Sequence, residues 1–229
     1  MGGIRLINTC IFDAYGTLFD VSAAAREAAA EPGNEALAEI WPQLAADWRF
    51  KQLQYSWLRA VARKHEDFWQ LTKDSLDWAL EAAKLDDPKL RERLLNLYWE
   101  LSPYPEVVEV LTYLKERGIQ TGILSNGTQE MLNGAVKRAG VGHLLDAVMS
   151  VETVKVFKPH DLVYEMVESR FICERNEVLF VSSNGWDAAG ASNFGYQTLW
   201  VNRQNEPVDR LYAQPQQIAP DLRAVLDLV

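Results

Sequence analysis

The sequence is poor in the residue types that disulfide, zinc and dinucleotide sites require. It has two cysteines, Cys10 and Cys173, and three histidines that are widely separated. Two cysteines form no disulfide framework, and the histidines lack the spacing of zinc ligands, so we expect reduced core thiols and histidines on the surface or in loops. No G-x-G-x-x-G pattern follows the first predicted strand, which argues against redox chemistry with a dinucleotide.

Long apolar runs and clusters of positive charge are also absent. No apolar stretch approaches the ~20 residues that cross a bilayer, and the formal net charge is −9. Nucleic acids and acidic membrane surfaces select clustered Lys and Arg, so we expect neither as a partner. Polar Asn8 and Thr9 interrupt the short apolar run near the N-terminus, which is not typical of a signal peptide. A cytoplasmic location is the default expectation.

The sequence does contain a regular alternation of two kinds of segment. Strand-like apolar runs occur between helical patterns, at residues 6–12, 119–124, 147–151, 177–182 and 197–201. Pro105 begins one helical pattern that stops at Gly118, and Thr128 is placed to cap the next one. Strands that alternate with helices of this length predict a parallel sheet with helices on both faces. A last short helix is expected to begin at Pro220.

Residues 20 to about 103 interrupt this alternation. They show long helical periodicity and no convincing strand, and they contain six of the eight tryptophans. Asp87-Pro88 supplies a cap and a first-turn proline for one of these helices. We interpret the segment as an inserted helical cap whose tryptophans mostly pack between its helices. The predicted domains are a core of residues 1–19 and 104–229, and a cap of residues 20–103.

Three polar clusters each follow directly on a predicted strand. They occupy residues 13–17, 125–127 and 182–187. Parallel strands bring their carboxyl ends to one edge of a sheet, where ligands of open α/β sheets bind, so we expect the three clusters to form one site. Taken singly, each cluster is equally consistent with an Asx-turn or a helix cap. The prediction therefore depends on their convergence.

Asp13 stands at the end of the first apolar strand, just before a glycine turn at Gly16. Residues 13–17 resemble the first motif of the haloacid dehalogenase superfamily, in which an Asp attacks an electrophile covalently. Most members are phosphatases with a second Asp two positions on, which protonates the leaving alcohol, a transfer worth roughly 10²–10⁴ in rate. That position is Tyr15 here. Because a halide leaves as a stable anion without a proton, the sequence favours carbon–halogen cleavage.

Further motifs narrow the resemblance to the type II L-2-haloacid dehalogenases. They are DAYGTLFD at 13–20, WR at 48–49, KQL at 51–53, LSNG at 124–127, a Lys-Pro pair at 158–159 and FVSSNGWD at 180–187. The match extends over nearly the whole chain. It implies an α/β fold with a Rossmann-like parallel sheet, helices on both faces and an inserted all-helical cap subdomain.

The resemblance also implies a reaction. Asp13 would displace halide from C2 of a short L-2-haloalkanoic acid by in-line attack, which forms an aspartyl ester and inverts the carbon. Water would then hydrolyse the ester and release a D-2-hydroxy acid. The implied enzyme is a cytoplasmic hydrolase that needs no metal or other cofactor, binds a 2-haloalkanoate and a halide ion, and forms a homodimer.

The same resemblance assigns catalytic and binding residues. The catalytic set would be Asp13, Thr17, Lys158, Ser183, Asn184 and Asp187. In it, Thr17 and Ser183 orient Asp13, while Asn184 and Asp187 position Lys158 and the hydrolytic water. A nearby ammonium at Lys158 would favour the charged form of the nucleophile.

The substrate-binding set would be Tyr15, Arg49, Ser125, Asn126, Trp186 and Tyr164. Arg49, Asn126 and the edge of Trp186 would contact the halide, which develops a full negative charge in a dry pocket. Ser125 and the backbone amides that follow the nucleophile would hold the substrate carboxylate. Tyr164 is placed near the catalytic lysine, and ordinary helix packing is an equal alternative for it.

Two departures from the family pattern leave details of the pocket open. Phe50 stands where a polar Gln is common, and Gly185 stands where a small Ala is common. They leave the pocket width and the position of Trp186 undetermined. The residues also leave open whether Asp187, Lys158 or both deprotonate the hydrolytic water.

Two other classes of function compete with the dehalogenase. A Mg²⁺-dependent phosphatase or phosphomutase of the same fold would need hard oxygen ligands. Asp13 and Asp187 could serve, but Ser183 and Asn184 fill a stretch where phosphatases usually have another acidic residue. The second alternative is a non-catalytic binding protein on the same scaffold, which has no need for cations beside a strand-end carboxylate.

Overall fold

A six-stranded parallel sheet lies at the centre of the larger part of the chain. The computed structural model describes residues 7–229, so Leu6, the first residue of the predicted strand 6–12, lies outside the described residues. The strand order is β3-β2-β1-β4-β5-β6, and every neighbouring pair is parallel. The strands are β1 (Thr9–Phe12), β2 (Gln120–Ser125), β3 (Ala147–Ser150), β4 (Val178–Ser182), β5 (Gln197–Val201) and β6 (Gln217–Ala219). The predicted parallel sheet is confirmed.

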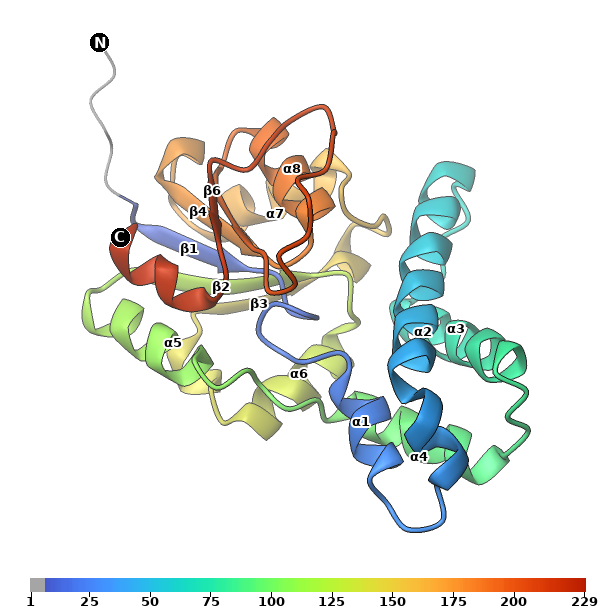
Figure 1. The fold of residues 1–229 in the computed structure, drawn as a ribbon. Helices are drawn as coiled ribbons and strands as arrows, with labels where there is room; N and C mark the ends of the chain where they lie inside the picture. The colour runs from blue at the N-terminus through green and yellow to red at the C-terminus, as the bar shows by residue number, and fades with distance from the viewer. Residues whose placement is uncertain (1–6) are drawn as a thin grey trace.

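Helices cover both faces of this sheet. They are α5 (Val107–Glu116), α6 (Gln129–Ala139), α7 (Asp161–Arg170) and α8 (Gly185–Phe194). In Figure 1, α7 and α8 lie above the sheet and α5 and α6 lie below it. Every residue of β1 and β4 is buried, as expected for central strands that are covered on both sides.

The local signals for helix ends are present in the structure. The Thr128 hydroxyl accepts a hydrogen bond from the backbone N–H of Met131 at 3.2 Å, and α6 ends at Gly140 in the left-handed conformation. Short 3₁₀ helices are η1 (Gly142–Leu144), η2 (Val151–Thr153), η3 (Arg175–Glu177) and η4 (Leu222–Asp227). The expected last helix is η4, and Asp221 rather than a first-turn proline begins it, since its carboxylate accepts from Arg223 N at 2.8 Å.

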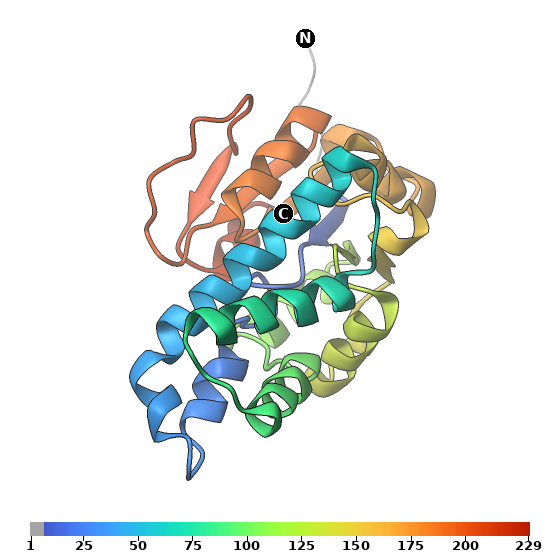
Figure 2. The same ribbon diagram turned by 90° about the vertical axis from the view of Figure 1, so that its right-hand side faces the viewer.

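Four helices stand between β1 and α5. They are α1 (Ala23–Ala29), α2 (Glu35–Ala62), α3 (Phe68–Ala82) and α4 (Pro88–Trp99), with no strand among them. Figure 2 shows α2 and α3 crossing in front of the sheet. We call α1 to α4 the cap. The domain boundaries at residues 19/20 and 103/104 stay a prediction.

The chain leaves the sheet for the cap and returns from it through two adjacent segments. Asp20 N donates to Ser102 O at 3.0 Å, and Tyr104 N donates to Leu18 O at 2.9 Å. Phe19 forms a bridge with Pro103. The outgoing and returning segments are therefore hydrogen-bonded to each other immediately beside the loop that contains Asp13.

Most cap tryptophans pack against other side chains. Trp48 is buried and its indole N–H donates to Thr72 O at 2.8 Å. Trp69 and Trp99 meet edge to face with ring centroids 4.8 Å apart. Trp78 differs because it is partly exposed beneath the Lys51 ammonium.

The two cysteines are both free thiols. Cys10 is buried in β1, and burial raises the pKa of its thiol above the usual range. Cys173 is only partly buried and packs against the core from the irregular segment after α7, so the expected core position is met in full by Cys10 and in part by Cys173. Within residues 7–229, no helix combines the length and apolar character needed to cross a membrane.

Candidate active site

The three predicted polar clusters meet at the carboxyl edge of the sheet. Asp13 follows β1, Ser125 ends β2, and Ser183 follows β4. Because β1 pairs with both β2 and β4, Phe12 lies between Ile123 and Val181 in the register. The predicted convergence of the clusters is confirmed by the structure.

Three donors surround the carboxylate of Asp13, which is 6% exposed. The Thr17 hydroxyl and the Asn184 side-chain amide each donate to Oδ2 at 3.0 Å. The Lys158 ammonium donates to Oδ1 at 3.1 Å. Hydrogen bonds to a charged acceptor are stronger than neutral ones, so these contacts fix the direction of the carboxylate.

Lys158 is 1% exposed and forms ion pairs with two carboxylates. Its Nζ lies 3.1 Å from Asp13 Oδ1 and 2.8 Å from Asp187 Oδ2. Burial lowers the pKa of Lys158, but Asp13 and Asp187 together outweigh it and raise that pKa above its usual value. Lys158 is therefore an ammonium ion at neutral pH.

Asp187 lies in the first turn of α8 and is fully buried. Burial raises its pKa above that of an ordinary carboxyl group, against the opposing effect of Lys158. Tyr164 donates its hydroxyl to Asp187 Oδ1 at 2.8 Å, and burial raises the pKa of this phenol far above its usual value. Tyr164 thus stays a protonated donor, and the two oxygens of Asp187 face Tyr164 and Lys158.

Thr17 is held in place by the loop that follows β4. Its hydroxyl accepts from the Ser183 backbone N–H at 2.8 Å while donating to Asp13. The tight turn before it needs glycine, since Gly16 has φ of 92° and a Cβ there would lie 3.0 Å from the Ser183 hydroxyl. Of the predicted pair, Thr17 therefore bonds to the Asp13 carboxylate directly, and Ser183 contacts Thr17.

Arg49 extends from α2 to the sheet edge. Its Nη2 donates to the Tyr15 carbonyl at 3.2 Å and to Asn184 Oδ1 at 3.3 Å. These contacts join the cap to the loops after β1 and β4. The structure thus brings the predicted cap arginine to the residues around Asp13.

A buried polar network behind Arg49 was missed by sequence reasoning. Gln52 Oε1 accepts from Arg49 Nη1 at 2.8 Å, and Gln52 Nε2 donates to Thr72 Oγ1 at 2.7 Å. Tyr98 exchanges hydrogen bonds with Gln52 and stacks on Tyr15 with ring centroids 5.8 Å apart. The available signal was the i, i+4 spacing of Gln52 after Trp48, which puts a polar residue on the buried face of the helix.

The second cluster contacts the lysine loop. Asn126 Oδ1 accepts from the Lys158 backbone N–H at 3.0 Å, so its NH₂ group is the part that is left to meet a ligand. The Ser125 hydroxyl is buried and accepts from Gly127 N at 3.2 Å. Trp186 meets Trp57 of α2 edge to face, with centroids 5.3 Å apart, which places it where the cap and the sheet edge touch.

The two departures from the expected pattern have structural explanations. Phe50 is 56% exposed on α2, so it does not line the site. Gly185 is the first residue of α8 and lies against the chain that follows β5: a Cβ there would be 3.1 Å from Asp209 Oδ2. A larger residue at Gly185 would require the Asp209 carboxylate to shift by a few tenths of an ångström.

Comparison with known proteins decides the family. The model of the haloacid dehalogenase-like hydrolases matches residues 7–195. The chain belongs to this family. It is 44% identical to (S)-2-haloacid dehalogenase 1 of Pseudomonas sp. (strain CBS-3), over 90% of this chain and 89% of that protein. It is 43% identical to (S)-2-haloacid dehalogenase 4A of Burkholderia cepacia, over 90% and 88% of the two chains.

A solved structure adds to this agreement. The L-2-haloacid dehalogenase from Xanthobacter autotrophicus with chloropropionic acid covalently bound superposes with a TM-score of 0.85, at 35% identity, covering 97% of this chain and 98% of that one. The resemblance to the L-2-haloacid dehalogenases of the haloacid dehalogenase-like family is therefore confirmed.

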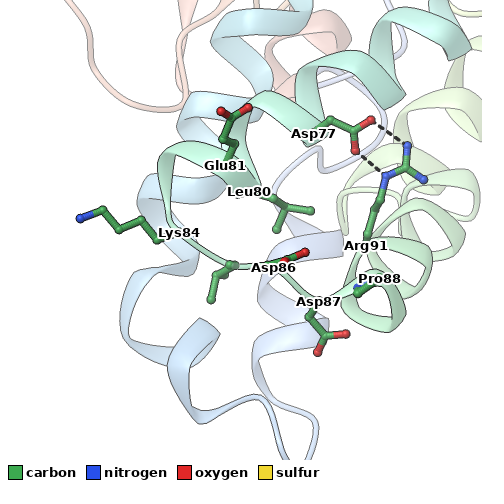
Figure 3. Close-up of a pocket in the computed structure, with 9 residues that line it drawn as sticks. Asp77, Leu80, Glu81, Lys84, Asp86, Asp87, Pro88 and Arg91 are labelled. Atoms are coloured by element: carbon green, nitrogen blue, oxygen red, sulfur yellow. Dashed lines mark hydrogen bonds and ion pairs between the residues drawn. The ribbon is translucent and has the colours of Figure 1, made fainter.

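Two other features of this haloacid dehalogenase-like chain lie apart from the site. A hollow of about 450 Å³ lies between α3 and α4, and none of the predicted site residues lines it. Figure 3 shows its lining residues, among them the ion pair of Asp77 and Arg91. Within residues 7–229, no group of three or more His, Cys, Asp and Glu side chains is arranged to hold a metal ion.

Proposed function

We propose that this chain is an (S)-2-haloacid dehalogenase that converts short L-2-haloalkanoic acids into D-2-hydroxy acids. The observation that supports this most is the carboxylate of Asp13, held by three donors and followed two positions later by Tyr15 instead of an acid. Tyr15 is buried, and burial raises its pKa well above the usual value, so it is a poor proton source. This arrangement suits a leaving group that needs no proton.

In the first step, a carboxylate oxygen of Asp13 attacks C2 of the substrate in line with the carbon–halogen bond. The new C–O bond forms as the halide leaves with the bonding electron pair, which inverts C2 and gives an aspartyl ester. Lys158 and Thr17 hold Asp13 in a fixed direction, and such fixed geometry supplies much of the rate advantage of an intramolecular reaction.

In the second step, water adds to the ester carbonyl carbon of Asp13 and gives one proton to a base. The bond between this carbon and the alkyl oxygen then breaks, the alkyl oxygen takes up that proton and leaves as the 2-hydroxy acid, and Asp13 returns to the carboxylate by releasing its remaining proton to water. We propose Asp187 as the base that takes the proton of this water. Its raised pKa makes it a stronger base than an ordinary carboxylate, while Lys158 with its own raised pKa stays protonated. Asn184 and Ser183 would help to position the water and Asp13.

We assign the departing halide to donors at the cap interface. Arg49 contributes a guanidinium, Asn126 its NH₂ group, and Trp186 the edge of its ring. Ser125 and the backbone amides after Asp13 would hold the substrate carboxylate. With carboxylate and halide both fixed, C2 accepts one arrangement of hydrogen and side chain, which selects the L enantiomer.

The decisive experiment measures halide release from L- and D-2-chloropropanoate with EDTA present. We expect chloride from the L form alone and none from Asp13→Asn. Asp20→Asn is the matched control, because Asp20 follows in the same segment but pairs with Arg26 away from the site. Turnover of p-nitrophenyl phosphate with Mg²⁺, without chloride release, would instead support the phosphatase alternative, and inactivity in both assays would support a binding protein.

Several broader properties belong to the same proposal. We propose a core of residues 1–19 and 104–229 with a cap of residues 20–103, a homodimer, a cytoplasmic location, and a reaction that needs no metal or other cofactor. Sedimentation of the purified protein tests the dimer, and retention of activity in EDTA tests the independence from metal.

A further inference from the structure

Arg203 takes no part in the steps above, yet it contacts the loop that contains the nucleophile. It follows β5, and its side chain is 16% exposed. Its Nη2 donates to the backbone carbonyl of Thr17 at 3.0 Å. The hydroxyl of the same threonine donates to Asp13 Oδ2 at 3.0 Å. Arg203 thus contacts the residue that holds the reacting carboxylate.

The same guanidinium holds the segment that returns from the cap. Its Nη1 lies 2.7 Å from Oε1 of buried Glu106, and its Cζ lies 3.7 Å from the ring centre of Tyr104. The Tyr104 backbone N–H in turn donates to Leu18 O at 2.9 Å. One side chain therefore joins the two segments that connect the cap with the sheet.

We propose that Arg203 is a positioning residue for the dehalogenation, which sets the direction of Asp13 through Thr17 and ties that direction to the returning cap segment. This inference rests on the proposed function. An arginine suits the task because its planar guanidinium can donate to a carbonyl and form an ion pair with a carboxylate while lying over an aromatic ring, which a lysine does not do. The buried pair with Glu106 supplies placement more than net stability.

Arg203→Lys tests the proposal, with Arg175→Lys as a matched control. Arg175 has the same three kinds of contact: a carboxylate at Glu168 (2.9 Å), the carbonyl of Phe194 (3.1 Å) and the Phe194 ring (3.8 Å). Among residues 7–229, these contacts of Arg175 are with Glu168 and Phe194, which are not residues of the site. We expect Arg203→Lys to lower kcat roughly ten- to hundredfold with KM unchanged, as a small misplacement of reacting groups does. Arg175→Lys keeps both constants.

A double variant separates positioning from charge neutralisation. Arg203→Met leaves the buried Glu106 carboxylate unpaired, and adding Glu106→Gln removes that charge. We expect the double variant to recover the melting temperature while kcat stays low, because the Thr17 carbonyl still lacks its donor. Recovery of wild-type kcat in the double variant, or equal kinetics for Arg203→Lys and Arg175→Lys, would overturn the proposal.

Hydrogen exchange distinguishes failure of this inference from failure of the proposed function. We expect faster amide exchange in peptides that cover residues 14–20 and 102–106 of Arg203→Lys, and unchanged exchange in Arg175→Lys. Wild-type protein that releases no halide would refute the proposed function, whereas the exchange experiment would still test whether Arg203 holds these two segments. Unchanged exchange in Arg203→Lys refutes the positioning role itself.

Discussion

Replacing Tyr164 by phenylalanine removes one hydroxyl from the buried charge cluster and leaves the ring in place. That hydroxyl donates to Asp187 Oδ1 at 2.8 Å, and Tyr164 is fully buried. A hydrogen bond to a charged group contributes about 1.5–3 kcal/mol to stability. We therefore expect Tyr164→Phe to lose about that amount of unfolding free energy wherever the carboxylate is charged.

The same substitution should also shift the pH dependence of activity. Burial raises the pKa of Asp187, while Lys158 and the Tyr164 hydroxyl oppose that rise. Without the hydroxyl the pKa of Asp187 rises further, so the carboxylate is protonated at a higher pH. Because a protonated Asp187 is no base, the acid limb of the kcat profile should move to higher pH, and the aspartyl ester should accumulate below that limb.

Tyr196→Phe is the matched control for this prediction. Tyr196 is also buried, but its hydroxyl donates to the neutral backbone carbonyl of Tyr164 at 2.8 Å. A neutral hydrogen bond contributes about 0.5–1.5 kcal/mol, and its loss should leave the acid limb in place. We would measure urea unfolding and halide release for both variants from about pH 5 to about pH 10, a range that extends to both sides of neutral pH. Equal losses of stability with coincident acid limbs would refute a role of Tyr164 through Asp187.

Three further predictions concern the turn, the cap and the lysine. Gly16→Ala should cost about 1–2 kcal/mol in urea unfolding and lower activity. Gly33 has a similar positive φ but open space around it, so Gly33→Ala should lose stability and keep its activity. Equal activity of the two variants would contradict the steric contact proposed at Gly16. Gln52→Leu should reduce kcat/KM roughly tenfold, because about 1.4 kcal/mol of hydrogen bonding to Arg49 is lost; an unchanged value would show that the network does not position this arginine. The raised pKa of Lys158 contributes stability that is complete below pH 10.5, the ordinary lysine value, and is lost as the pH rises through the higher folded-state pKa. The melting temperature should therefore fall as the pH rises through that alkaline range. If Lys158→Met showed the same fall as the wild type, the fall would not come from Lys158, and this explanation would be contradicted.

Much of the fold could be predicted because its signals are local. The five longer strands are apolar runs, and the helix caps at Thr128 and Asp87 depend on neighbours within three residues. β6 was missed because it has three residues, two of them exposed, and its pairing with β5 is decided by tertiary contact alone. The expected last helix took the 3₁₀ form for which the sequence pattern has no distinct signal.

The candidate site could likewise be predicted only in part. Asp13 and the polar clusters were predictable because strand-end polar residues of a parallel sheet share one edge, which follows from chain direction alone. The sequence by itself thus determined that a carboxylate, the proposed nucleophile Asp13, ends the first strand, that no acid stands at position 15, and that strands alternate with helices.

Only the tertiary structure decided which groups bond to which. Arg203 and Thr17 are 186 positions apart, and Arg49 and Asn184 are 135 apart. No periodicity or spacing encodes such contacts, because a side chain finds its partner only after strand order and cap placement bring the segments within about 3 Å. The contacts of Gln52, Tyr98 and Arg203 are therefore known only from the packed structure, whereas the placement of Asp13 could be predicted from its position at the end of a strand.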